Sequence, residues 1–551
     1  MKKALKSMLV LALAVMLMIT GAGCGKKGKD AKSVSSSDLS APNEFPIVKE
    51  KTELTIFISK PNMIADIETN EFTKWYEEKT GVHINWDIAS GDTKQAINLR
   101  LASGDLPDIF WKCGFTPVEV YAYGQQGMFL DLTDLIDEHM YYFKDILSKR
   151  EDIKKKITQE GAIYGLPTVL ESAGQRCLDK MWVYKPWLDK LGLEMPTTID
   201  EFYEMLKAFK EQDPNGNGKA DEIPLGGRGI YSDTGIEDYI MNAFTYTDTR
   251  TARIYVEKGK VKCSATTDGY REGLRFIKKL YDEGLLLRDV FTIDRTRLTA
   301  LGENEGVPIL GACVGQWPGM FTLSGAESGR ITEYTSIPPL AGPTGLRQTA
   351  RTDITNSTGT SFIVTKDCKN PEVAVKWVDW MYSNEGRIKT QGVQGYREAK
   401  EGEIALNGKQ AKYTYDPVPP EEQNTKFGMV QNETWGANFI IQYFDLDMVS
   451  SEKLLDTDLN KMLYYEAIDK YFEFVVDKSY PILPIDQDMA AEYQDLQDTI
   501  NQAIDQNFVA FVTGEKDIDK DWDSYKKELD GYGLSNLLKL AQKRYDKFAN
   551  K

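Results

Sequence analysis

The chain has 551 residues, of which 41% are hydrophobic and 27% charged, and its formal net charge is −17. This composition is typical of folded soluble proteins, and the 28 Tyr, 22 Phe and 10 Trp residues exclude a wholly disordered chain. The negative charge disfavours nucleic-acid binding, because the phosphate backbone would be repelled. With two histidines, a histidine-based catalytic centre is not expected, and the length suggests about two to four domains.

The N-terminus has the pattern of a secretory signal peptide. Three lysines precede an uncharged apolar run, Met8–Ile19, whose 12 residues fall short of the about 20 that a helix needs to cross a bilayer. We therefore predict a signal peptide over residues 1–23. The small residues before Cys24 resemble a bacterial lipobox, although Gly21 stands where that motif usually has an aliphatic residue. We expect lipidation of Cys24, which would hold the protein on the outer face of a bacterial cell membrane by the lipid alone, and the alternative is an ordinary signal peptide with a chance cysteine.

The segment after the signal peptide has a low-complexity composition, and the remaining cysteines show no metal-binding or redox spacing. Residues 24–46 are rich in Ser, Lys and Gly, which predicts a flexible tether. The other cysteines form no CxxC pair, so we expect single buried thiols, with one disulfide as an open alternative. These cysteines are Cys113, Cys177, Cys263, Cys313 and Cys368.

From residue 54 onward, the pattern alternates between strand and helix. Strands are predicted over 54–58, 83–88 and 108–111, and helices over 71–79 and 92–103. This order predicts right-handed crossovers and a parallel sheet. Ligands of such sheets bind beyond the carboxyl ends of the strands, which places a candidate site after residues 58 and 111.

Several motifs resemble the extracellular solute-binding proteins of sugar ABC transporters. Residues 100–111, RLASGDLPDIFW, resemble the family motif a-S-G-D-x-P-D-I. Further matching segments follow in the family's order, namely Tyr123–Leu132, Ile163–Pro167, Trp187–Gly192, Leu280–Leu285 and Phe511–Gly514. The resemblance extends over residues 50–548, and the most similar subgroup is the long lipoproteins related to alginate-oligosaccharide-binding proteins.

This resemblance implies an α/β, two-lobed periplasmic-binding-protein-like fold. Each lobe is expected to hold a doubly wound, mostly parallel sheet flanked by helices, with extra helices at the C-terminus. The N-terminal lobe would comprise 47–167 plus 356–396, and the C-terminal lobe 168–355 plus 397–551. The implied function is capture of a carbohydrate between the lobes and its delivery to an ABC permease by a monomeric protein that is not an enzyme.

Two other functions stay open from the residues alone. A secreted glycoside hydrolase would need two carboxylates about 5–9.5 Å apart, and no local motif identifies such a pair. A receptor for a non-sugar ligand on the same scaffold is the second alternative.

Five residues are candidates for ligand contact. Proteins stack aromatic rings on the apolar faces of sugars and bind their rims with polar groups. Trp111, at the third strand end, and Trp317, in a glycine-flanked loop, are expected to stack on the ligand as the family's tryptophans do, with core packing as the alternative. Glu171 resembles the carboxylate at the first crossing between lobes. Tyr231 and Lys60 are weaker candidates, chosen mainly by position. Trp75, Trp187, Trp377 and Trp380 fall at helical spacing and are expected in the core.

Residues 213–222, DPNGNGKADE, have the spacing of a calcium loop. Oxygen-bearing side chains fall at loop positions 1, 3, 5 and 9 with glycine at position 6, as in an EF-hand. Position 12 is Pro224, which excludes a true EF-hand, and Glu222 at position 10 would replace the usual glutamate, as in the alginate-binding proteins. The alternative is a Gly/Asn turn that ends the preceding helix. The predicted ligands of a structural Ca²⁺ are Asp213, Asn215, Asn217, the carbonyl of Lys219, Asp221 and Glu222.

Overall fold

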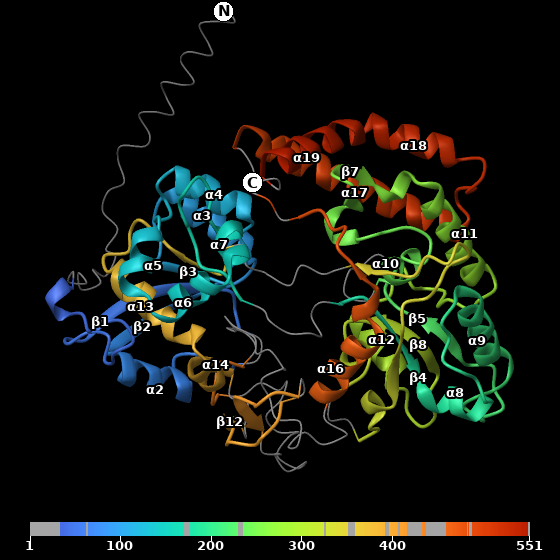
Figure 1. Cartoon of the computed structure of the whole chain (residues 1–551), viewed down its shortest axis with the longest axis horizontal. Helices are drawn as coiled ribbons and strands as arrows, with labels where there is room; N and C mark the ends of the chain where they lie inside the picture. Colours follow the sequence, from blue (N-terminus) through green and yellow to red (C-terminus); the bar gives the residue numbers. More distant parts are fainter. Residues whose placement is uncertain are drawn as a thin grey trace, which may run out of the picture.

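A computed structural model of the chain shows two lobes side by side (Figure 1). The structure describes residues 34–61, 64–169, 177–229, 235–323, 327–350, 359–391, 396–405, 408–415, 432–436, 459–481, 483 and 487–548. Within these ranges, the predicted two-lobed α/β architecture is confirmed.

Lobe 1 is built on a four-stranded sheet in the order β11-β3-β1-β2. Strand β1 pairs in parallel with β2 and β3, and β11 pairs antiparallel with β3, so this sheet is mostly parallel as predicted. The strands are β1 Thr52–Ile58, β2 Val82–Ile88, β3 Ile109–Trp111 and β11 Phe362–Val364. The helices are α2 Glu71–Thr80, α3 Thr93–Ser103, α4 Pro117–Gln125, α5 Thr133–His139, α6 Tyr142–Lys149, α7 Glu151–Ile157, α13 Pro371–Asp379 and α14 Asn384–Gln391.

Local sequence signals fix the ends of the first helices of lobe 1. The side chain of Asn70 accepts hydrogen bonds from the first amides of α2, and Gly81 ends that helix with a φ of 76°. Asp92 caps α3 in the same way, and Gly104 ends it with a φ of 74°. Because these caps end both helices at defined residues, the chain returns from each helix to the next parallel strand. The predicted order of strands and helices is therefore confirmed in this part of lobe 1.

Lobe 2 contains a second four-stranded sheet, in the order β5-β8-β4-β9. Only β5 and β8 are parallel, whereas β4 runs antiparallel to both β8 and β9, so the expectation of a mostly parallel sheet is wrong for this lobe. Its strands are β4 Lys180–Tyr184, β5 Ile223–Gly226, β8 Leu310–Gly315 and β9 Tyr334–Ile337, with the hairpin β6 Ile254–Glu257 and β7 Lys260–Cys263. Its helices are α8 Lys185–Leu191, α9 Ile199–Glu211, α10 Ile236–Met241, α11 Asp268–Asp282 and α12 Arg295–Gly302.

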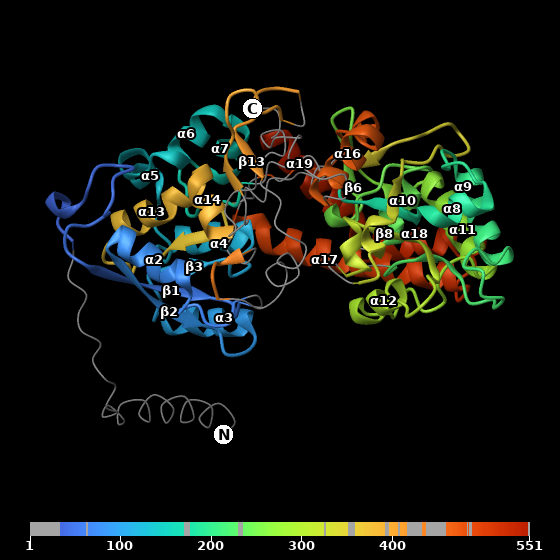
Figure 2. The ribbon, with the colours of Figure 1, turned by 90° about the horizontal axis from the view of Figure 1, so that it is seen from below.

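The C-terminal part of the chain adds helices to lobe 2, as expected. They are α16 Leu459–Lys470, α17 Gln487–Thr513, α18 Trp522–Gly531 and α19 Leu534–Phe548. The long helix α17 packs on α11 and α19 and also touches α4 of lobe 1, where Val118 packs against the lobe 2 core (Figure 2). Among the described residues, no helix has both the length and the apolar character to cross a membrane.

Three short two-stranded pairings complete the secondary structure. They are the hairpin already named, the parallel pair β10 Thr349–Ala350 and β14 Val475–Val476, and the antiparallel pair β12 Tyr396–Glu398 and β13 Tyr413–Tyr415. The cysteines at 113, 177, 263, 313 and 368 are all buried, and no disulfide joins them within the described residues, which confirms the prediction of single buried thiols.

Two predicted boundaries are corrected by the packing. Trp435 was assigned to lobe 2 by its position after residue 397, but its buried ring packs in the lobe 1 core, 4.7 Å from the ring of Phe72. Residues 34–46, predicted to belong to a flexible tether, lie against lobe 1. The amide of Val34 donates to Asn370 at 2.7 Å, and the ammonium of Lys376 donates to the carbonyl of Ala41 at 3.0 Å.

Candidate ligand-binding site

The carboxyl ends of the lobe 1 strands lie in one row. Ile58 at the end of β1 is in register with Ile88 of β2 and with Trp111 of β3, and Trp111 is in register with Phe362 at the start of β11. The residues that follow β1, β2 and β3 therefore emerge at the same edge of the sheet. This is the edge where ligands of parallel α/β sheets bind.

The turn after β3 is tightly constrained. Lys112 has a φ of 50° and Gly114 a φ of 75°, so two of three consecutive residues are in the left-handed region. The thiol of Cys113, between them, donates to the carbonyls of Phe57 and Trp111 at 3.4 Å each. The amide of Lys112 donates to the carbonyl of Ser361 at 2.6 Å, which ties the turn to the residue just before β11.

The side chain of Lys112 is partly buried. Burial lowers the pKa of its ammonium from the usual range to about 8, because a charged group loses hydration there. A lysine in a left-handed conformation is sterically unfavourable, and such strain concentrates at functional sites. The pattern of strands and helices predicted the edge but gave no signal for Lys112, because backbone strain is not visible in the sequence.

Lobe 2 presents a comparable edge. Lys180 at the start of β4 is in register with Gly315 at the end of β8, and Met181 with Ile337 at the end of β9. The buried ammonium of Lys180 donates to the carbonyl of Cys177 and lies 5.8 Å from the ring centroid of Tyr471, and burial lowers its pKa to about 8. The side chain of Lys180 is thus held in place by contacts with other residues of lobe 2.

Both edges border the places where the chain passes between the lobes. Val169 packs in the lobe 1 core and Cys177, eight positions later, in the lobe 2 core. Ala350 packs with Tyr246 in lobe 2, whereas Phe362 begins β11 in lobe 1. The strand ends of both lobes therefore lie next to the segments in which the chain passes from one lobe to the other.

The predicted ligand contacts have different outcomes. Lys60 is exposed and follows β1 at the lobe 1 edge, as expected. Trp111 is 0% exposed, so the prediction that it stacks on a ligand is wrong for this structure: its ring packs in the core between those of Trp86 and Trp377. Glu171 and Tyr231 lie outside the described residues.

Trp317 follows β8 at the lobe 2 edge and is partly buried. Its indole lies on Gly319, where an added Cβ would come within 2.5 Å of the ring, so only glycine allows this packing. The guanidinium of Arg295 donates to the carbonyl of Gly319 at 3.2 Å, which fixes the far side of the turn. The ring is thus held at the edge, where it is partly buried against the lobe 2 core.

The other tryptophans were expected in the core. Trp187, Trp377 and Trp380 are buried as predicted. Trp75 is 37% exposed, so its assignment to the core is wrong, although its ring lies 5.6 Å from that of Trp380.

The loop over residues 213–222 is closed by its own side chains. The carboxylate of Asp213, whose φ is 47°, accepts hydrogen bonds from the amides of Gly216, Asn217 and Gly218 at 3.0–3.1 Å. The amide of Lys219 donates to the side chain of Asn217 at 2.7 Å. The same oxygens that would hold a cation therefore also order the backbone of the loop.

The second half of the loop gathers carboxylates. The side-chain amides of Asn215 and Asn217 donate to Asp221 at 2.9–3.1 Å and lower the pKa of that carboxyl. Oε1 of Glu222 is buried and accepts no hydrogen bond from the described residues. Burial, together with the charges of Asp213 and Asp221, raises the pKa of Glu222. Within the described chain, no group of three or more His, Cys, Asp or Glu side chains has the arrangement of a metal site.

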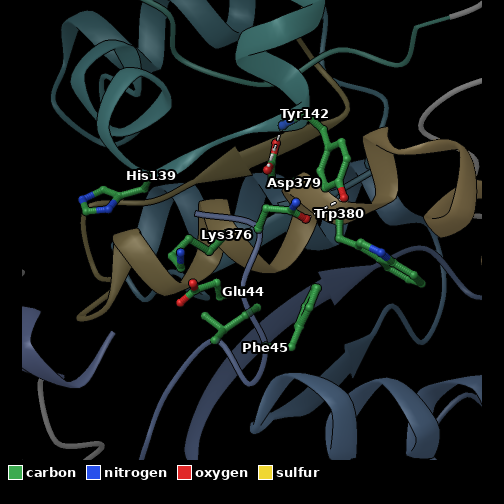
Figure 3. Close-up of a pocket in the computed structure, with 9 residues that line it drawn as sticks. Glu44, Phe45, His139, Tyr142, Lys376, Asp379 and Trp380 are labelled. Atoms are coloured by element: carbon green, nitrogen blue, oxygen red, sulfur yellow. Dashed lines mark hydrogen bonds between the residues drawn. The ribbon is translucent and has the colours of Figure 1, made fainter. Parts of the chain in front are cut away.

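A small cavity lies apart from these strand ends (Figure 3). Residues of the N-terminal segment, α5, α6 and α13 line it, with room for about one water molecule. The carboxylate of Asp379 accepts the backbone amides of Tyr141, Tyr142 and Phe143 at 2.7–3.1 Å, and the hydroxyl of Tyr142 donates to Asn43 at 2.5 Å. These contacts make the cavity a structural joint between the N-terminal segment and lobe 1.

Comparisons with known proteins agree with this geometry. Residues 62–388 match the family model of bacterial extracellular solute-binding proteins. The chain is 30% identical over 562 aligned positions to a fructooligosaccharide ABC transporter substrate-binding protein, FusA, of Streptococcus pneumoniae, with 99% of this chain and 98% of that protein covered.

Solved structures extend the likeness to the whole fold. FusA of S. pneumoniae in complex with kestose superposes with a TM-score of 0.72 at 27% identity, covering 91% of this chain and 100% of the other. An EF-hand mutant of FusA with fructo-nystose gives 0.71 at the same identity and coverage. The alginate-binding protein AlgQ2 without calcium ion, at 24% identity, shares the fold with a TM-score of 0.63 over 90% of this chain and 98% of that one.

The function of this family is to bind solutes, which separates the chain from the hydrolases that its residues alone left open. The family match covers more than half of the chain, and the S. pneumoniae relative is similar over almost all of it. The chain therefore belongs to the bacterial extracellular solute-binding proteins.

Proposed function

We propose that this protein captures an oligosaccharide between its two lobes and delivers it to an ABC permease, and that fructooligosaccharides are its ligand class. The observation that carries the proposal is the similarity to the fructooligosaccharide-binding FusA over 99% of the chain, at 30% identity. The same carboxyl edges border both crossings between the lobes, which gives the ligand a place to bridge them.

The side chains at these edges suit a sugar. Trp317 offers a partly exposed indole, which stacks on the apolar face of a pyranose or furanose ring. Lys60 offers an exposed ammonium with three donors for hydroxyl oxygens. Glu171 and Tyr231 stay in the proposal as ligand contacts by their positions in the sequence alone.

Direct binding measurements test the ligand class. Kestose and nystose should raise the melting temperature of the purified protein and bind with 1:1 stoichiometry in calorimetry, because a ligand that binds only the folded state stabilises it. Maltotriose and a uronic acid trisaccharide are the matched controls of similar length. Binding of a control sugar alone would change the ligand class, and cleavage products on prolonged incubation would point to a hydrolase.

The proposed binding mode depends on Trp317. Replacement of Trp317 by Ala should weaken kestose binding about tenfold or more while the melting temperature changes little, because the ring is only partly buried. Replacement of Trp75, which is 37% exposed in lobe 1, provides the control for loss of a surface tryptophan. Equal affinities of both variants would remove Trp317 from the site.

We further propose that Cys24 is lipidated and holds a monomeric receptor on the outer face of the cell membrane. The support is the signal-peptide pattern over residues 1–23 with small residues before Cys24. Mass spectrometry of the mature N-terminus should find a diacylglycerol thioether on Cys24, and Cys24→Ala should release the protein from the membrane fraction. Light scattering of the soluble protein checks the monomer. An unmodified N-terminus at another residue would contradict the anchor.

We also propose that the loop over residues 213–222 holds a structural Ca²⁺. The residues fit a hard cation, because carboxylate and amide oxygens recur at alternate positions and Oε1 of Glu222 is buried without a hydrogen-bond donor in the described chain. Asp213, Asn215, Asn217, Asp221 and Glu222 would hold the ion with their side chains, and Lys219 with its carbonyl. Bound Ca²⁺ would neutralise these carboxylates and fix the loop between α9 and β5.

Removal of the metal provides the test. Chelation should lower the melting temperature of the wild-type protein, and Asp213→Ala should abolish this sensitivity. Asp134→Ala, which removes an exposed carboxylate from α5 of lobe 1, is the matched control and should remain sensitive to the chelator. A wild-type melting curve that ignores the chelator, with no calcium found by elemental analysis, would reject the site.

A further inference from the structure

Lys112 combines four features that Lys60, the proposed contact at the same edge, does not share. It directly follows β3, the strand that lies between β1 and β11 in the lobe 1 sheet. Its backbone has a φ of 50°, and its side chain is partly buried. Its amide is bonded at 2.6 Å to Ser361, in the segment that enters lobe 1 from lobe 2.

The backbone of this turn works against a lysine. Glycine adopts a φ of 50° freely, whereas a residue with a Cβ meets steric resistance there. The turn already uses glycine at 114, two positions later, where the φ is 75°. Other described residues share such a φ, Lys258 among them, but Lys112 is the one that directly follows a strand at the lobe 1 edge, where ligands of parallel sheets bind.

We propose that Lys112 is a specificity-determining ligand contact, whose ammonium donates hydrogen bonds to hydroxyl oxygens of a neutral oligosaccharide. The inference rests on the proposed function, because it deepens the chemistry of the same interlobe site. Partial burial makes the contact selective, since an ammonium removed from water interacts more strongly with the oxygens that replace it.

The pH dependence of this contact comes from burial, which is the cause of the lowered pKa of Lys112. The charged groups on neighbouring elements are Lys60 after β1, Asp87 of β2 paired with Arg100 of α3, and Glu119 of α4 paired with Lys94. The thiol of Cys113 is neutral near pH 8, because burial raises its pKa to about 12. Lys112 titrates near pH 8, so the donor is an ammonium at pH 7 and mostly an amine at pH 9.

The experiment compares Lys112→Gly and Lys112→Arg with the wild-type protein, by calorimetry with kestose at pH 7 and pH 9 and by melting curves. Lys112→Gly should lose about tenfold or more in affinity at pH 7, with no fall in melting temperature, because glycine accepts the backbone conformation. The wild-type affinity should fall by up to about tenfold between pH 7 and pH 9. Lys112→Arg keeps its charge over that range, so its affinity should be independent of pH.

Lys51→Met is the matched control. Lys51 is an exposed lysine just before β1, at the opposite edge of the same sheet, and its loss changes the net charge equally. Affinity for kestose should be unchanged in this variant.

Two results would overturn the inference. The first is wild-type binding of kestose that Lys112→Gly leaves intact at both pH values. The second is a Lys112→Gly variant that melts at a much lower temperature yet binds with wild-type affinity, which would make Lys112 a structural residue. Failure of the wild-type protein to bind kestose, nystose or the control trisaccharides would instead contradict the proposed function.

Discussion

In lobe 1 the sheet is backed by a cluster of aromatic rings, whereas in lobe 2 buried charges hold the helices together. The ring of Trp111 lies 5.4 Å from those of Trp377 and Trp435. In lobe 2, Arg253 and Glu237 are each 1% exposed and form an ion pair at 2.6 Å.

The difference between aromatic packing in lobe 1 and buried ion pairs in lobe 2 follows from the elements that each lobe holds together. The lobe 1 rings come from strands and helices that pack face to face, and ring contacts are satisfied by many arrangements. Arg253 of the β6 strand region also pairs with Asp505 of α17 at 2.6 Å, and Tyr270 of α11 donates to Glu237 at 2.8 Å. These directional hydrogen bonds and ion pairs therefore attach α17 to lobe 2. Loss of one member of this buried network leaves the polar groups of the other members without their partners.

The largest effect is expected in the lobe 2 network. Arg253→Met should lower the free energy of unfolding by about 3–5 kcal/mol, because Glu237 would be left as an uncompensated buried charge. Denaturant titration measures the change. Combining it with Glu237→Gln should recover part of the loss, whereas additive losses in the double variant would contradict the pairing.

A buried hydrogen bond in lobe 1 should matter less. The hydroxyl of Tyr76 donates to the carbonyl of Trp377 at 2.5 Å, within the aromatic cluster. Tyr76→Phe keeps the ring but leaves that carbonyl without its donor, and should cost about 1–3 kcal/mol in thermal or denaturant unfolding. Tyr141→Phe, at a tyrosine that is 53% exposed, is the control and should be neutral.

The helix caps should give similar effects in both lobes. Asn70 caps α2 in lobe 1, and Thr198 caps α9 in lobe 2. Replacing either by Ala should lower the free energy of unfolding by about 1 kcal/mol, because one side-chain acceptor for the first amides is lost. The buried side-chain amide of Asn70 also donates to the carbonyl of Thr434 at 2.9 Å, so the loss should be somewhat larger for Asn70 than for Thr198. A larger loss for Thr198 would contradict this assignment.

The smallest effect concerns the glutamates of two matching capping boxes, Thr116 with Glu119 on α4 and Thr198 with Glu201 on α9. Burial opposes the shift, but Lys94 and Thr116 together lower the pKa of Glu119, and the amide of Thr197 lowers that of Glu201. A lowered folded pKa gives stability above the ordinary glutamate pKa, which is lost as the pH falls through the folded value.

The Gln variants test this sign. Glu119→Gln and Glu201→Gln should each reduce stability by a few tenths of a kcal/mol at pH 7. The differences from the wild-type protein should shrink in melting curves recorded towards pH 3, since the wild-type carboxylates are then protonated. The effect should be larger for Glu119, which pairs with Lys94 at 2.5 Å. Differences that grow on acidification would reverse the assigned pKa shifts.

The sequence predicted lobe 1 better than lobe 2 for a physical reason. In lobe 1 each strand is followed by a capped helix and then a parallel strand, so local periodicity determines the order. In lobe 2 the antiparallel β4 is paired with β8 and β9, which lie more than 100 residues later in the chain. No local pattern reports such a long-range pairing.

The residues of the candidate ligand-binding site were predictable where the order of strands in the sheet determines their position. The position of Lys60 followed from the end of β1, but the burial of Trp111 depends on Trp435, which comes from a distant part of the chain. Lys112 escaped prediction because its distinguishing feature is a backbone angle. The loop proposed to bind calcium could be recognised in the sequence because its oxygens are spaced within ten consecutive residues.

The attachment of the N-terminal segment to lobe 1 sets a length scale for the proposed membrane anchor. The amide of Val34 is hydrogen-bonded to Asn370, so ten residue-to-residue steps lead from Cys24 to a fixed point on lobe 1. Ten residues span at most about 33–36 Å, which is close to the thickness of one bilayer core. An anchored receptor would then be confined to a thin layer above the membrane that holds the permease. Encounter with the permease would then depend on rotation of the protein about this short linker and on diffusion along the membrane more than on diffusion through the bulk solution.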